Sequence, residues 1–243
     1  MIRDALEYII EMSKPSVVEV YGRCYKRESL DLITDPTLQD PFKVSTLDAL
    51  VEFIANNTDN ILDEIGIIIH VQGYDRVDVY GEANTDMRRN HYLQTAALCP
   101  EPLRYGHFYD TESFNILLQS RFEDNADKQL LLQLTGNIKD EAVKQVGDNG
   151  ITQSVTVKTG VTNVDNVIVP NPVTLVPRRT FFEIEQPASP FVYRMQSGPE
   201  CALFEADGGA WKQEAIKRIA DYLVKRLADA LNDETMGKIK VIA

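Results

Sequence analysis

The stretch from Arg178 to Leu231 limits the possible folds of this chain more than any other part of it. It reads RRTFFEIEQPASPFVYRMQ, then CALFEADGG, then WKQEAIKRIADYLVKRLADAL. Apolar and polar residues alternate in the first two segments, which is typical of half-buried strands, and the prolines of QPASP bound a turn. The third segment repeats apolar residues at helical spacing. This stretch therefore predicts a β-hairpin, a third strand and a long amphipathic helix packed on the hairpin.

Within that stretch the alternation assigns side chains to faces. The first predicted strand has two faces, Phe182, Ile184 and Gln186 on one and Phe181, Glu183 and Glu185 on the other. Asp207 is the expected N-cap of the helix. We expect five residues of the unit to be packed in a core, namely Phe182, Ile184, Trp211, Ile219 and Leu223.

Helical and strand-like patterns alternate through the rest of the chain, without a Gly/Ser linker or an internal repeat. Near the N-terminus, MIRDALEYIIEM predicts a short amphipathic helix, and Gly22 separates the two arms of a predicted hairpin. Ser45 is the expected cap of a helix over TLDALVEFIANN, and TESFNILLQSRF predicts another helix, capped by Asp110 or Thr111. The runs IGIIIHVQ and RVDVYGEA predict a hairpin near the middle of a sheet, followed by a strand in HYLQTAALC. Residues 151–176 predict further strands, interrupted by prolines.

These patterns together predict an α+β fold with mixed, largely antiparallel sheets and about four helices. We expect a single domain over residues 1–243, with a division into lobes at 1–104 and 105–243 left open. Hydrophobic residues make up 44% of the chain and charged residues 26%, which is the composition of a globular protein with a real core. No apolar run reaches the roughly 18 residues needed to span a bilayer, and the acidic N-terminal segment is unlike a secretion signal. The expected location is the cytoplasm, with no membrane contact.

The three cysteines, Cys24, Cys99 and Cys201, are widely separated and show no CxxC spacing for zinc or redox chemistry, so they are expected to be free thiols. A net charge of −12 opposes nonspecific binding to nucleic acid, because such binding depends on cationic side chains. A nucleic-acid surface would have to be local. The speculative binding surface comprises Arg178, Arg179, Glu183, Glu185 and Arg194. Phe181 and Tyr193 beside these arginines could stack single-stranded bases, although such residues more often form the core of a hairpin.

Four carboxylates recur at two-residue spacing on neighbouring predicted strands, Glu183, Glu185, Glu205 and Asp207. If the two faces coincide, these groups could hold magnesium for a metal-dependent hydrolase. Acidic residues on a solvated strand face are the commoner interpretation of this pattern. The three histidines lack zinc-site spacing, and the chain has neither a phosphate-binding glycine loop nor a GxSxG motif. The sequence therefore predicts no cofactor and no catalytic residue, which favours a non-enzymatic protein without excluding an enzyme.

Several segments taken in order resemble a known group of proteins. These are FYDTESFNILLQSRF, VGDNGITQSVTVKTGV, VPNPVTLVPRRTFFEIEQPASPFVYRM and LFEADGGAWKQEAI. Over residues 105–243 the chain resembles phage and prophage proteins of Gram-positive bacteria, distantly similar to the YfdQ-like family of unknown function. The resemblance implies a phage origin, and it brings neither an assigned activity nor site residues.

The first functional hypothesis is a non-enzymatic phage accessory protein that acts through protein–protein contacts in the host cytoplasm. It would form a homo-oligomer and bind a host or phage protein, and so modulate host defence or phage DNA metabolism. Three alternatives stay open. They are a single-stranded nucleic-acid-binding recombination accessory, a virion structural protein and a metal-dependent hydrolase.

Overall fold

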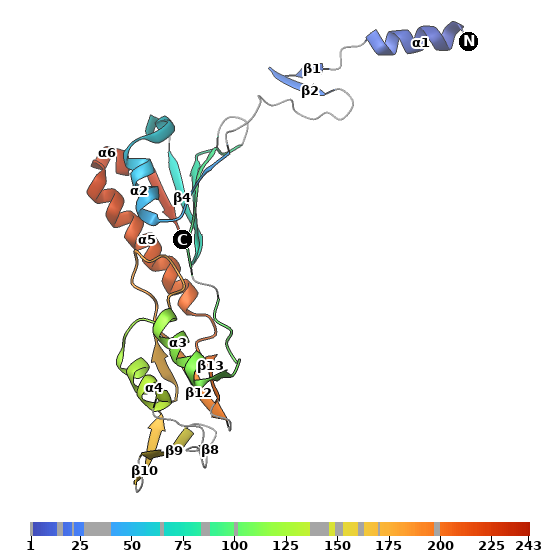
Figure 1. Ribbon diagram of the computed structural model, residues 1–243. Coiled ribbons are helices and arrows are strands. Elements are labelled where there is room, and N and C mark those ends of the chain that lie inside the picture. The colour runs from blue at the N-terminus through green and yellow to red at the C-terminus, as the bar shows by residue number, and fades with distance from the viewer. Residues whose placement is uncertain are drawn as a thin grey trace. The chain divides into compact units, whose positions relative to one another are not determined.

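The computed structural model describes residues 2–13, 17–20, 22–26, 40–63, 66–83, 88–99, 102–136, 146–148, 153–159, 163–169, 171–196 and 200–243. The chain divides into two compact units, Met1–Gln39 and Asp40–Ala243 (Figure 1). The fold is α+β with largely antiparallel sheets, as the sequence predicts. Among the described helices, none is both long enough and apolar enough to cross a bilayer.

The described residues of the N-terminal unit form one helix and one hairpin. Helix α1 spans Ile2–Ser13, and strands β1 (Val17–Val20) and β2 (Arg23–Lys26) pair antiparallel. Gly22 lies between the strands with a φ of +75°, a conformation that glycine adopts without steric cost. Both predicted elements are confirmed. The unit leaves many large apolar side chains exposed, among them Leu6, Tyr8, Ile9, Ile10, Met12, Val17, Val18 and Val20.

A five-stranded sheet organises the first half of the second unit. Its order is β14-β4-β5-β6-β3, with β14 parallel to β4, β3 parallel to β6, and the other pairs antiparallel. The strands are β3 (Phe42–Val44), β4 (Ile67–Gly73), β5 (Arg76–Gly81), β6 (His91–Ala96) and β14 (Ile239–Ile242). The predicted hairpin of β4 and β5 is confirmed, and both strands lie inside the sheet.

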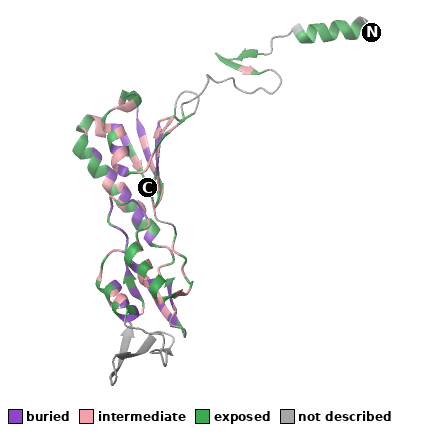
Figure 2. Cartoon of the chain, in the orientation of Figure 1, coloured by how far each residue is buried: buried purple, intermediate pink, exposed green. Residues whose placement is uncertain are grey.

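Helices α2 (Leu47–Ala55) and α5 (Trp211–Ala230) lie beside this sheet, and the first hydrophobic core forms between them (Figures 1 and 2). Alternate residues of the strands point into the core, which explains the period of two in their sequences. The core includes Leu47, Leu50, Ile54, Ile67, Ile69, Val77, Val79, Leu93, Ile219, Leu223 and Leu227. The long C-terminal helix thus packs on a β-hairpin, which is the one formed by β4 and β5. Because this core also contains Phe181 and Ile184, it combines residues from both sides of the predicted lobe boundary at 104/105.

The N-caps of helices α2 and α5 differ from the expected ones. Thr46, one residue after Ser45, caps α2, and its hydroxyl accepts a hydrogen bond from the backbone N–H of Ala49 (3.2 Å). Helix α5 begins at Trp211 with Ala210 as N-cap and no side-chain cap, so Asp207 does not cap it. Gly208 and Gly209, both with positive φ, turn the chain between Asp207 and the helix.

A second core lies under a four-stranded antiparallel sheet of order β11-β12-β13-β7. The strands are β11 (Val173–Leu175), β12 (Ser189–Gln196), β13 (Glu200–Glu205) and β7 (Tyr109–Asp110). Helices α3 (Thr111–Arg121) and α4 (Ala126–Gly136) cover it, and Asp110 caps α3, as predicted. This core contains Phe114, Leu118, Phe122, Phe191 and Tyr193, all fully buried.

The remaining elements are short or lie at the ends of these layers. Strands β8 (Val146–Asp148), β9 (Gln153–Thr159) and β10 (Asn163–Val169) form an antiparallel sheet of order β10-β9-β8, which confirms strands in the Thr/Val-rich stretch. A 3-10 segment, η1 (Thr58–Asp63), follows α2, and α6 (Asp233–Met236) precedes β14.

The prediction of a strand over residues 178–186 is wrong, because this segment is a loop. The buried amide of Gln186 takes the place of a neighbouring strand. Its oxygen accepts from the backbone N–H of Arg179 (3.0 Å), and its nitrogen donates to the carbonyl of Phe181 (2.8 Å). Phe181 and Ile184 are buried, whereas Phe182, expected in the core, is 58% exposed. The other four residues of the predicted packing set are buried as expected.

Candidate functional site

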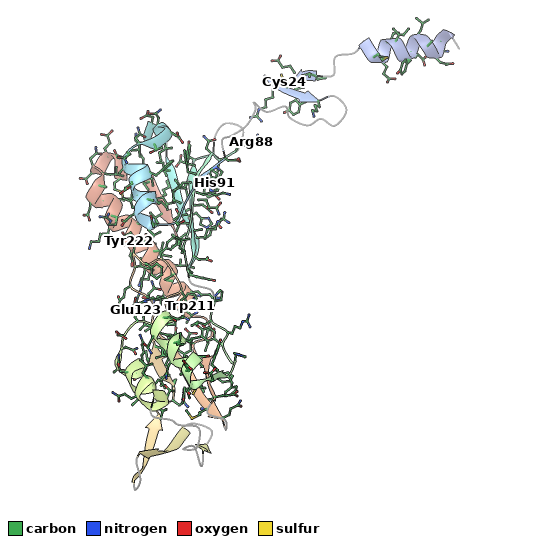
Figure 3. All side chains as sticks on the ribbon, in the orientation of Figure 1. Cys24, Arg88, His91, Glu123, Trp211 and Tyr222 are labelled. Carbon is green, nitrogen blue, oxygen red and sulfur yellow. The ribbon has the colours of Figure 1, made fainter. Side chains whose placement is uncertain are left out.

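A cavity of about 280 Å³ lies beside the start of α5, where Figure 3 labels Trp211. Side chains from five separate stretches of the chain line it. The β4–β5 turn contributes Tyr74 and Asp75, and α3 contributes Arg121 at its last position. The other lining residues are Cys99, Pro102, Leu103, Tyr105, Arg178, Arg179 and Trp211.

Arg179 is held at one side of this cavity by several partners. Its Nη1 lies 3.1 Å from Glu205 Oε1, and its Nη2 donates to the hydroxyl of Ser189. The guanidinium carbon lies 3.8 Å from the ring centroid of Trp211, in cation–π geometry. Burial lowers the pKa of Arg179 from its usual value, but the nearby Tyr105 and Glu205 oppose that shift, so the guanidinium stays charged at neutral pH.

Asp207 completes the network behind Arg179. The hydroxyl of Ser189 donates to Asp207 Oδ2 (2.7 Å), and the backbone N–H of Gly209 donates to Oδ1 (2.9 Å). Burial alone would raise the pKa of Asp207, but these hydrogen bonds and the charge of Arg179 lower it below the usual value. Asp207 is therefore an ionised group that holds Arg179 indirectly through Ser189.

Two ionisable side chains of the lining, the thiol of Cys99 and the phenol of Tyr105, are neutral at physiological pH. Burial, with a smaller contribution from the Asp75 carboxylate, raises the pKa of the Cys99 thiol to about 11. Burial also raises the pKa of Tyr105 to about 12. Because the thiolate is the reactive form of cysteine, this environment favours binding over nucleophilic chemistry.

The raised pKa of Cys99 should make its thiol slow to react at neutral pH. We expect Cys24, which is exposed, to react with an aromatic disulfide reagent at least about tenfold faster than Cys99 and Cys201 at neutral pH. The rate at Cys99 should rise with pH towards its pKa of about 11. Replacing Cys24 with serine should remove the fast phase alone. Equal rates at Cys24 and Cys99 in the folded protein would contradict the prediction.

The structure separates the five residues of the predicted binding surface. Arg178 and Arg179 both line the cavity. Glu183 Oε1 instead accepts from the backbone N–H of Leu47 (2.7 Å), at the start of α2. Glu185 lies 3.4 Å from Arg218, and Arg194 in β12 donates to the carbonyl of Tyr193 (3.1 Å). Only the two adjacent arginines are therefore brought to one site.

The four carboxylates proposed for a metal site have different partners. Glu183 contacts the N-terminus of α2 and Glu185 contacts Arg218, whereas Glu205 and Asp207 belong to the Arg179 network. Because the 178–186 segment is a loop, its acidic residues do not share a strand face with those of β13. Within the described residues, no group of three or more His, Cys, Asp and Glu side chains is placed to hold a metal ion.

The base-stacking surface proposed for single-stranded nucleic acid is also not assembled. Phe181 is 1% exposed and Tyr193 is fully buried, so neither ring can receive a base. The aromatic residues beside the arginines are instead Tyr74, Tyr105 and Trp211. Sequence reasoning missed this set because its members lie far apart along the chain. The single tryptophan is the signal that the sequence offers, and its pattern predicts only packing.

A second polar cluster lies in the five-stranded sheet, on strands β5 and β6. Asp78 is fully buried, although its strand pattern predicts half exposure. Its carboxylate oxygens lie 3.2 Å from Arg76 Nε and 3.2 Å from His91 Nε2. The ring of His91, labelled in Figure 3, stacks on Tyr80 with centroids 4.5 Å apart. These contacts satisfy the buried carboxylate and give Asp78 a structural role.

Comparisons with protein-family models, with curated proteins and with solved structures give no match for this chain.

Proposed function

We propose that this chain is a non-enzymatic accessory protein that acts through protein–protein contacts and self-associates through its N-terminal unit. The observation that carries this proposal is the exposed apolar surface of α1. Leu6, Ile9 and Ile10 are each more than half exposed, and Met12 is 70% exposed. Clustered exposed apolar side chains of this size are typical of interaction sites.

The length of α1 adds a physical reason for a partner. A helix of 12 residues is only marginally stable in water by itself, and most helical stability comes from packing an apolar face. Leu6, Ile9 and Ile10 lie on one side of α1 by helical spacing, opposite Asp4 and Glu11. A second copy of the chain offers the same stripe, so two stripes can pack by two-fold symmetry.

The wider role is proposed from two further features. The resemblance of residues 105–243 to prophage proteins favours an accessory protein of phage infection, located in the host cytoplasm. Host defence and phage DNA metabolism are the processes it would modulate. The neutral Cys99 thiol and Tyr105 phenol support a role in binding rather than catalysis.

The alternatives have less support from the arrangement of residues. A single-stranded nucleic-acid binder would need the rings of Phe181 and Tyr193, which are buried. A metal-dependent hydrolase would need the four predicted carboxylates in one place, but Glu183, Glu185 and Glu205 contact different partners. A virion structural role is compatible with strands β9 and β10, and analysis of purified particles would distinguish it.

Self-association is tested by measuring the mass of the full chain in solution over a wide concentration range, by light scattering and sedimentation equilibrium. We expect a mass that is a multiple of the chain mass. Replacing both Leu6 and Ile9 with asparagine should raise the dimer dissociation constant at least about a hundredfold, because two buried apolar side chains are lost.

Glu11→Asn provides the matched control for that variant. It introduces the same residue type on the polar side of the same helix, so the mass distribution should not change. A strict monomer at every concentration would overturn self-association. An oligomer unaffected by the double substitution would show that α1 is not the contact.

A further inference from the structure

The cavity beside Trp211 concentrates positive charge in an acidic protein. Three arginines line it, Arg121, Arg178 and Arg179, against the single carboxylate of Asp75, whereas the whole chain has a net charge of −12. Acidic groups outside the lining, Glu205 and Asp124, approach Arg179 and Arg178. Because Glu205 and Asp207 counter the charge of Arg179, the positive charge that the lining offers to an anionic ligand comes from Arg121 and Arg178.

Arg121 and Arg178 are held next to each other by the backbone. The N–H of Arg178 donates to the carbonyl of Arg121 (2.8 Å), and the adjoining residues Phe122 and Pro177 form an isolated antiparallel bridge. This pairing joins the end of α3 to the 178–186 loop. Both side chains line the cavity, and two arginines at adjacent backbone positions can bind several oxygens of one phosphate group.

The lining also contains aromatic side chains. The rings of Tyr74 and Trp211 lie 4.8 Å apart at 59°, and Tyr105 and Leu103 belong to the same lining. Two buried donors of lining residues, Arg179 Nε and Trp211 Nε1, have no hydrogen-bond acceptor within the part of the chain that the structure describes. Trp211 is only 7% exposed, so its N–H group is a buried donor that a ligand acceptor could satisfy.

We propose that this cavity binds a small phosphate monoester that carries a planar ring, with the phosphate at Arg121 and Arg178 and the ring against Tyr74 and Tyr105. The volume of about 280 Å³ is close to the lower end of the range for ligand pockets, which favours a mononucleotide over a larger ligand. This ligand site is independent of self-association through α1.

The only tryptophan of the chain lines the cavity, so its fluorescence reports on the site directly. The full chain is titrated with adenosine 5′-monophosphate, excited at the red edge of the indole band, where adenine does not absorb. We expect a saturable change in emission, with inorganic phosphate and adenosine each binding at least about tenfold more weakly. No saturable change with the nucleotide up to about 10 mM at low salt would overturn the proposal. Equal affinity for inorganic phosphate and the nucleotide would overturn the role of the ring.

Arg178 is exposed and can be replaced without disturbing a core. Arg178→Ala should weaken nucleotide binding at least about tenfold, because one of the two charges at the phosphate is lost, and Arg178→Lys should retain part of the affinity. Arg89→Ala is the matched control, since Arg89 is also exposed but does not line the cavity. If Arg178→Ala binds the nucleotide with unchanged affinity, the phosphate group does not bind at Arg178.

A second readout uses Cys99, which also lines the cavity. Saturating nucleotide should slow its reaction with a thiol reagent at least about threefold, while the rate at the exposed Cys24 stays the same. An unchanged Cys99 rate would place the nucleotide elsewhere. Repeating both measurements on the Leu6, Ile9 double variant separates the two proposals, since loss of self-association should leave the cavity intact.

Discussion

Replacing Leu223 with alanine is expected to lower the free energy of unfolding by about 3–4 kcal/mol. Leu223 is fully buried on α5, in the core shared with α2 and the five-stranded sheet. The substitution removes apolar contacts and leaves a cavity between two layers that cannot collapse freely. Urea denaturation followed by circular dichroism measures the change, with an unchanged dependence on urea concentration as the sign of a pure stability effect.

Val224, the next residue along α5, is the matched control for that experiment. It is 44% exposed, so Val224→Ala should change the free energy of unfolding by less than about 1 kcal/mol. A loss below about 1 kcal/mol in Leu223→Ala would contradict the packing of α5 on the sheet.

Replacing Arg179 with alanine is expected to cost about 2–3 kcal/mol of stability. The substitution leaves Glu205 and Ser189 without their partner and exposes one face of Trp211. Loss of one member of a fully buried ion pair costs more, but the side chain of Glu205 is 32% exposed, so water compensates in part. The free energy of unfolding, measured by denaturation, should therefore be clearly lower for Arg179→Ala than for Arg178→Ala. The value for Arg178→Ala should be close to that of the unmodified protein.

A double-mutant cycle assigns this loss to the pair itself. Arg179→Ala, Glu205→Ala and the combined variant should give a coupling energy of about 1 kcal/mol or more, because the two side chains are in contact. Additive effects would show that Arg179 stabilises the fold through Trp211 and Ser189 and not through Glu205.

Elements with a strong local period could be predicted from the sequence. The apolar stripe of α5 and the continuous apolar run of β4 depend on neighbours a few residues away, so periodicity finds them. The 178–186 segment has the alternation of a strand but forms a loop, because Gln186 supplies its hydrogen-bond partners from within. Asp78 alternates like an exposed residue, yet Arg76 and His91 allow its burial.

The candidate site could be predicted only in part. The adjacent arginines at 178 and 179 form a cluster of charge that is visible in the sequence, and both line the cavity. Their aromatic neighbours could not be found in the same way. Tyr74 and Trp211 lie 4.8 Å apart in space, but most of the chain separates them in sequence, and no local pattern predicts such a contact.

The position of β14 in the sheet has a consequence for how this protein is made. Residues Ile239–Ile242 pair with β4, and α5 covers the core, yet β4, β5 and β6 are synthesised long before either. At about 5–20 residues per second, the ribosome needs roughly 7–30 s to extend the chain from Ala96 to Ile239. During most of that interval the apolar face of β4 and β5 lacks the part of its cover that α5 provides. Nascent chains of this protein are therefore expected to depend on chaperones, and folding of the first core should be completed after translation.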